Sequence, residues 1–138
     1  MCRQDVIRIG SWKHALVGTD GLPSRMEENG HPRAFGAFPR ALRLYVEELG
    51  LFTLEEMVHR MTGAAAERLN LPDKGLVRPG YDADFLLVDM ARFRDEATYR
   101  RSNRTASGLK AVYVSGQAAW ADGRLTGYRG GRFIRRRA

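Results

Sequence analysis

The feature that most constrains this chain is a short apolar run over residues 15–17 that leads to a single acidic residue, Asp20. A run of this kind predicts a strand over residues 14–19 that is buried on both faces. Gly21 and Pro23 then break regular structure, so the carboxylate of Asp20 lies where the strand ends and a loop begins. Catalytic groups of α/β enzymes occupy this position, because the strand is rigid and the loop opens to substrate. An Asp-Gly pair after a strand is also an ordinary turn, and spacing alone leaves both interpretations open.

A strand that is buried on both faces needs neighbouring strands, and the sequence offers few of them for residues 14–19. Left alone, such a strand exposes unpaired backbone groups, which predicts marginal solubility or self-association. Three arrangements would give the backbone groups of this strand their partners. The β-rich second half of the chain covers it, a partner chain covers it, or the chain is one end of a longer protein.

Composition places the chain among ordinary globular proteins. Its 138 residues suffice for one domain with a single core, and 43% hydrophobic and 28% charged residues are normal for a soluble chain. No apolar run approaches the ~20 residues that a membrane helix needs, and the first residues lack the long apolar stretch of a signal peptide. Cys2 is the only cysteine, so no intrachain disulfide can form. We therefore expect a cytoplasmic protein without a membrane partner.

The net charge is +7, from 23 Lys and Arg residues against 16 Asp and Glu residues. A basic tail can bind nucleic acid or an acidic surface, and it can equally be a solvated terminus. No aromatic stacking platform or known nucleic-acid module accompanies the charge, so we expect no nucleic-acid partner. The arginines that concentrate near the end of the chain are Arg129, Arg132, Arg135, Arg136 and Arg137.

The first half of the chain reads as a loop followed by helices. Residues 21–36 are rich in glycine, proline and polar residues, which predicts a long loop. Pro39 suits the first turn of a helix and Gly50 suits its end, whereas Thr53 and Glu56 have capping-box spacing for a second helix. The apolar stripes of these helices and of a third, over residues 62–69, are Leu42, Tyr45, Val46 and Leu49, then Leu54, Met57, Val58 and Met61, then Ala65 and Leu69.

The character of the sequence changes near Leu71, where proline and glycine residues begin to punctuate it. This change predicts a first part over residues 1–70 and a β-rich second part over residues 71–138. Residues 91–108 are polar and rich in arginine, which predicts a loop with at most one helical turn. Short apolar segments separated by glycine-containing turns predict a β-meander. These segments are residues 85–88, 111–115, 117–120 and 125–126.

Four segments, taken in order, resemble the C-terminal part of the N-acyl-D-amino-acid deacylases of the amidohydrolase superfamily. They are TDG (residues 19–21), the run from HPRAFG to AERLNL (31–71), KGLVRPGYDADFLLVD (74–89) and the run from VYVSGQ to RFIRR (112–136). The resemblance covers nearly the whole chain and includes segments with no obvious chemical role.

The resemblance implies an α/β fold, the C-terminal end of a metal-dependent (β/α)8 barrel plus the C-terminal share of a small β-sandwich. Ala15–Asp20 is similar to the eighth barrel strand, residues 37–69 to the helices after it, and residues 71–138 to the sandwich portion. The barrel expected for this chain is therefore incomplete.

The resemblance also implies roles for two side chains. Asp20 matches the aspartate at the end of the eighth strand, which accepts a proton from a zinc-bound water and later protonates the departing amine. Arg33, in the sequence His31-Pro32-Arg33, is similar to the arginine that binds the α-carboxylate of the substrate. His31 is expected to structure the loop rather than to bind metal.

The metal ligands of the family lie upstream of this region, and the sequence contains none of them. Its three histidines are His14, before the predicted strand, His31, and His59, on a predicted helix surface. Cys2 lies too close to the start of the chain to be the bridging ligand. A zinc site needs three or four converging ligands, so we expect this chain alone to bind no zinc tightly. Another departure is the loop in which Arg100, Arg101 and Arg104 replace the family's acidic or Asn-Pro sequence.

Two hypotheses about function follow. In the first, the chain is a truncated hydrolase of N-acyl-D-amino acids that is inactive alone and works only when an upstream polypeptide supplies the missing barrel. In the second, it is a non-catalytic binding or interaction module derived from the same fold.

Overall fold

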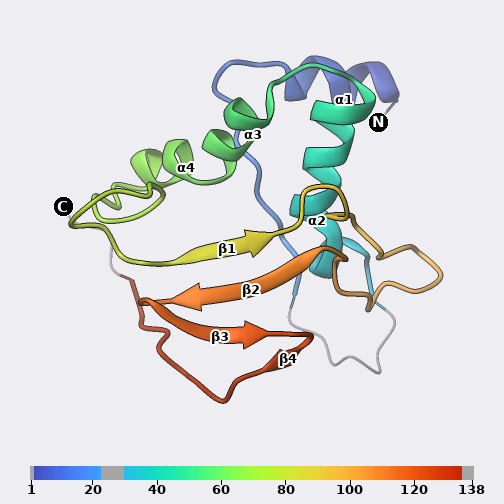
Figure 1. The fold of residues 1–138 in the computed structure, drawn as a ribbon. Coiled ribbons are helices and arrows are strands. Elements are labelled where there is room, and N and C mark those ends of the chain that lie inside the picture. The colour runs from blue at the N-terminus through green and yellow to red at the C-terminus, as the bar shows by residue number, and fades with distance from the viewer. Residues whose placement is uncertain (1, 23–29, 135–138) are drawn as a thin grey trace.

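The computed structural model describes residues 2–22 and 30–134; Pro23 and Arg135, Arg136 and Arg137 lie outside them. Figure 1 shows the strands stacked in chain order, with the helices on the β1 side of the sheet and β4 farthest from them. Within the described part, no helix is both long and apolar enough to cross a membrane. The elements are α1 (Arg3–Gly10), α2 (Arg33–Leu42), the π-helix η1 (Arg43–Glu48), α3 (Leu54–Met61), α4 (Gly63–Arg68), β1 (Phe85–Val88), β2 (Leu109–Val114), β3 (Gln117–Ala121) and β4 (Arg124–Leu125).

The predicted β-meander is confirmed. All three strand pairs are antiparallel, in the order β1-β2-β3-β4. The β3–β4 turn has positive φ at both Asp122 (51°) and Gly123 (82°), the backbone that a two-residue hairpin turn requires. Phe85 on β1 stacks on Tyr113 of β2 with ring centroids 4.5 Å apart, so the register is supported by a cross-strand aromatic pair.

The predicted second helix is also confirmed. The Thr53 hydroxyl accepts from the Glu56 N–H (3.2 Å), and the Glu56 carboxylate accepts from the Thr53 N–H (2.8 Å), which completes the capping box. Behind this cap Met57 is 1% exposed and belongs to the small core. Gly50 has φ of 59°, as expected for the residue that follows a helix end.

The start of the first long helix was predicted wrongly. α2 begins at Arg33, and Pro39 lies inside it rather than in its first turn. A proline inside a helix removes one backbone hydrogen bond. Gly36, Pro39 and Ala41 are all buried, so Pro39 lies on the face of α2 that packs against the rest of the protein. Residues 33–36 of the expected loop therefore belong to α2, and residues 23–29 of that loop lie outside the described residues.

The strand predicted over residues 14–19 is absent, and Leu16 is 39% exposed. The reason is pairing, because a strand requires a neighbour and the four strands of the sheet pair only with one another. One smaller expectation also fails, because Leu69 is 57% exposed and α4 ends before it. The loop predicted over residues 91–108 is confirmed; it forms a single bridge, Arg94 to Ser107, and contains no helix.

Candidate active site

The two side chains that the sequence singles out lie together. Arg33 Nε is 2.9 Å from Asp20 Oδ1, although the residues belong to different segments. Asp20 lies in the segment without regular structure that follows α1, and Arg33 is the first residue of α2. Both side chains reach solvent, with 77% of Asp20 and 46% of Arg33 exposed. An exposed ion pair of this kind contributes about 0.2–1 kcal/mol to stability, so each side chain can readily exchange its partner for another.

Thr19 attaches this segment to the beginning of α2. Its hydroxyl donates to the Arg33 carbonyl (3.2 Å) and accepts from the Gly21 N–H (3.1 Å). A Cβ on Gly21 would lie 2.8 Å from Ala34 Cα, so the two segments are in close contact. Thr19 was not among the site residues predicted from the sequence. The signal was present, because a threonine two residues before a glycine is typical of a side-chain-closed turn.

His31 organises the same helix start. Its Nδ1 accepts from the Arg33 N–H (3.1 Å), one of the amide groups that the first turn of a helix leaves without a partner. Its ring meets the ring of Tyr99 edge to face, with centroids 5.2 Å apart. These contacts agree with a loop-structuring role.

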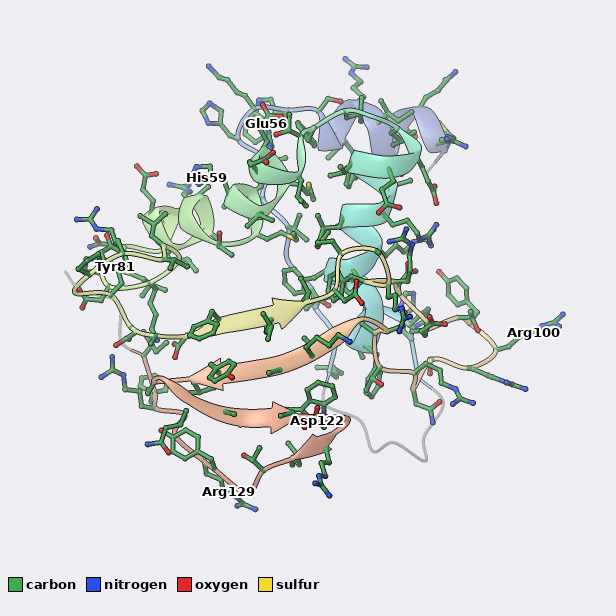
Figure 2. All side chains as sticks on the ribbon, in the orientation of Figure 1. Glu56, His59, Tyr81, Arg100, Asp122 and Arg129 are labelled. Atoms are coloured by element: carbon green, nitrogen blue, oxygen red, sulfur yellow. The ribbon has the colours of Figure 1, made fainter. Side chains whose placement is uncertain are left out.

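A pocket of about 430 Å³ lies beside Arg33, between α2 and the loop over residues 91–107. His31, Arg33, Arg40 and Tyr99 line it, and Asp20 does not. Arg33 therefore belongs both to the ion pair and to the lining of the pocket. In Figure 2, Arg100 extends outward from the far end of the same loop.

Asp95 fixes this loop to the helices. Its side chain is 5% exposed, and its two oxygens accept from Arg43 Nε (2.7 Å) and Nη2 (3.2 Å), with Arg40 3.5 Å away. Burial raises the pKa of Asp95. The hydrogen bonds and the charge of Arg43 lower the pKa by more than burial raises it, so the net pKa falls below its usual value. The carboxylate stays ionised and bound. Its arginine partner is 52 residues away in the chain, so no local sequence pattern indicated it.

The described residues do not fit a resident metal. Among residues 2–22 and 30–134, no three His, Cys, Asp or Glu side chains converge on one point. His14 packs edge-on against Trp12, His59 lies on α3 (Figure 2), and Cys2 is exposed. Zinc requires three or four ligands, so any metal at this site needs ligands from polypeptide outside the described residues.

Residues 14–119 match the model of the amidohydrolase family, which is most of the chain. The chain belongs to the amidohydrolase family. It is 41% identical over its whole length to a D-aminoacylase of Alcaligenes xylosoxydans xylosoxydans and spans 28% of that protein. The resemblance to N-acyl-D-amino-acid deacylases found in the sequence is thereby confirmed.

Solved structures of amidohydrolases superpose well on this chain. A D-aminoacylase mutant in complex with CuCl2 matches 99% of the chain and 28% of its own, with a TM-score of 0.91 and 42% identity. An N-acyl-D-glutamate deacylase from Bordetella bronchiseptica, complexed with zinc and a phosphonate inhibitor, matches 90% of the chain and 26% of its own, with a TM-score of 0.81 and 34% identity. Zinc thus occurs in the family. The chain spans about a quarter of the length of the relatives it matches.

Proposed function

We propose that this chain forms the C-terminal part of a hydrolase that cleaves the amide bond of N-acyl-D-amino acids. The observation that carries the proposal is the Asp20–Arg33 pair at 2.9 Å in a chain 41% identical to a D-aminoacylase over its full length. Residues 1–70 would contribute the end of the barrel and residues 71–138 part of the β-sandwich. Ala15–Asp20 would become the eighth barrel strand once a neighbouring strand pairs with it.

The two side chains have complementary tasks in this reaction. Water adds to the acyl carbon, the C–N bond breaks, and the products are a carboxylate and a D-amino acid. Asp20 accepts a proton from the attacking water and returns it to the departing amine. Arg33 binds the α-carboxylate of the substrate, because a planar guanidinium matches a carboxylate through two parallel hydrogen bonds. Metal chemistry, where the family uses it, needs ligands that the described residues do not provide.

The partners that follow are a small N-acyl-D-amino acid and a polypeptide that completes the barrel. Leu16 and Leu22 are exposed on the unpaired segment, and Leu86 and Leu87 are exposed on β1. These apolar side chains would be covered by the completing polypeptide, or by a second copy of the chain if none is present. A cytoplasmic location remains a prediction, supported by the single cysteine, Cys2.

Co-expression tests the proposal. The chain is combined with a polypeptide covering the first three quarters of a related D-aminoacylase, with zinc supplied, and hydrolysis of N-acetyl-D-methionine is followed by the release of D-methionine. We expect turnover only when both polypeptides are present, and none with N-acetyl-L-methionine. A folded complex that leaves the D-substrate intact would contradict the proposal.

A folded complex that does not hydrolyse the D-substrate would favour a second function, in which the chain is a binding module for small anions. The observation behind it is the pocket of about 430 Å³, where Arg33 and Arg40 both keep exposed guanidinium groups. Such a module would bind N-acetyl-D-methionine without cleaving it.

A further inference from the structure

We propose that the Asp20 carboxylate binds the Arg33 guanidinium at the position that the substrate carboxylate later takes. The arriving substrate then displaces Asp20 from Arg33 by carboxylate exchange. This inference rests on the proposed function and adds a step to it. The side chain that transfers protons is bound to Arg33 until the α-carboxylate of a substrate takes its place.

The geometry of the Asp20–Arg33 ion pair supports this exchange. Asp20 contacts the guanidinium at one point, through Oδ1 near Nε. Among the residues that the structure describes, no other carboxylate lies within ion-pair distance of Arg33, because Asp95 is bound by Arg40 and Arg43 instead. A free α-carboxylate can form two parallel hydrogen bonds with the same guanidinium, and such bidentate contacts are stronger than a single-point one.

The Asp20 side chain can leave Arg33 without breaking the hydrogen bonds that hold its backbone. Its side chain is 77% exposed. The backbone around it is held by the Thr19 hydroxyl, which bonds to the Arg33 carbonyl and the Gly21 N–H and does not involve the Asp20 carboxylate. Exchange therefore needs only a rotation of the Asp20 side chain.

The pocket beside Arg33 gives a substrate carboxylate access to this side chain. Arg33 and His31 line the pocket of about 430 Å³, whereas Asp20 does not. An anion in the pocket would therefore lie beside Arg33 without first replacing Asp20 as a lining residue. A consequence is selectivity, because an N-acyl amino amide, which lacks the carboxylate, would leave Asp20 bound to Arg33.

The test measures carboxylate binding to the chain itself. The 15N-labelled chain is titrated with N-acetyl-D-alanine at about 0.15 M ionic strength, where exposed charges act over only ~8 Å, and the Arg33 Nε–H signal is followed by NMR. The signal is assigned with Arg33→Gln. N-acetyl-D-alaninamide is the probe without a carboxylate. Asp20→Asn removes the competing charge, and Glu55→Gln on α3 removes the same charge from a site away from Arg33.

We expect N-acetyl-D-alanine, but not the amide, to shift the signal. The half-saturating concentration should be about 1.4-fold to fivefold lower in Asp20→Asn than in the wild type, the range that loss of an exposed ion pair of about 0.2–1 kcal/mol gives. Glu55→Gln should match the wild type. Equal half-saturation in Asp20→Asn and wild type would overturn the exchange while leaving Arg33 as the carboxylate site of the proposed function. A signal that responds to neither compound in either protein would overturn both the exchange and the substrate role of Arg33.

Discussion

At the scale of single residues, the position of Asp20 depends on the Thr19 hydroxyl, which bonds to both the Arg33 carbonyl and the Gly21 N–H. Thr19→Val keeps the shape of the side chain and removes both bonds. We expect the Gly21 amide to exchange its hydrogen faster in this variant, because its acceptor is lost. Each lost bond should lower the free energy of unfolding by about 0.5–1.5 kcal/mol.

Thr19→Ser is the matched control, because it retains the hydroxyl. Its Gly21 amide should exchange at the wild-type rate in a hydrogen-exchange NMR experiment. Equal exchange in the valine and wild-type proteins would show that the hydroxyl does not hold the segment.

Asp95 has a different residue-scale role, since it joins the loop over residues 91–107 to α2 and η1 through Arg43 and Arg40. Asp95→Asn removes the charge from a nearly buried site and breaks the two-point ion pair with Arg43, which keeps its other ion pair, with Glu48. We expect the free energy of unfolding in urea to fall by about 1–3 kcal/mol. Asp89→Asn, whose ion pairs are 3.9 Å long, should change it by less than about 0.5 kcal/mol. Equal losses in the two variants would contradict the role of Asp95.

At the scale of elements, a charge cluster connects the beginning of β1 to the β2–β3 turn and to the C-terminal segment. Lys74 pairs with Asp82 (2.8 Å) and with Asp84, and Arg132 pairs with Asp82 (2.6 Å). The hydrogen bond from Lys74, followed by the Ser115 N–H, holds the pKa of Asp84 below its usual value. The hydrogen bonds from Lys74 and Arg132 lower the pKa of Asp82 in the same way.

This cluster predicts a loss of stability in acid. A carboxyl group whose pKa is lower in the folded state stabilises the fold above the unfolded-state value of about 3.9, and this contribution disappears as the pH falls through the folded-state value. We expect the free energy of unfolding, measured between about pH 5 and pH 3, to fall less steeply in Asp84→Asn than in the wild type. Asp122→Asn, in the β3–β4 turn (Figure 2), should leave the slope unchanged. Parallel slopes in all three proteins would contradict this account.

Elements that depend on neighbouring residues were predictable from the sequence. The capping box of Thr53 and Glu56, and the glycine-containing turn between the last two predicted strands, which is Asp122-Gly123, act over two to four residues. Both were correctly predicted. The strand over residues 14–19 depends on partner strands, which its own apolar pattern cannot reveal. In the candidate site, the resemblance indicated Asp20 and Arg33. Asp95 was missed because the arginine that binds it is 52 residues away.

At the scale of the whole molecule, the chain leaves much apolar surface uncovered. Among residues 2–22 and 30–134, the buried hydrophobic residues are few and mostly small, whereas Trp12, Leu22, Leu86 and Val77 are exposed. We expect the purified chain to self-associate, which sedimentation velocity would detect as species that grow with concentration. A monodisperse monomer with a cooperative melting transition would contradict this expectation.

The isolated chain should also lack zinc-dependent deacylase activity, because the described residues do not bring together three metal ligands. Metal analysis after dialysis, together with an assay on N-acetyl-D-methionine, checks this. Stoichiometric zinc with turnover by the chain alone would show that the catalytic site is complete without a partner.

The central claim is that Asp20 transfers protons in amide hydrolysis when the barrel is complete. The most direct measurement is the rate of N-acetyl-D-methionine hydrolysis by the complemented enzyme carrying Asp20→Asn, compared with wild type at equal zinc content. Loss of a proton-transfer group predicts a fall in kcat of about 10²–10⁴-fold, with the complex still assembled. A kcat within a few-fold of the wild-type value would contradict the claim.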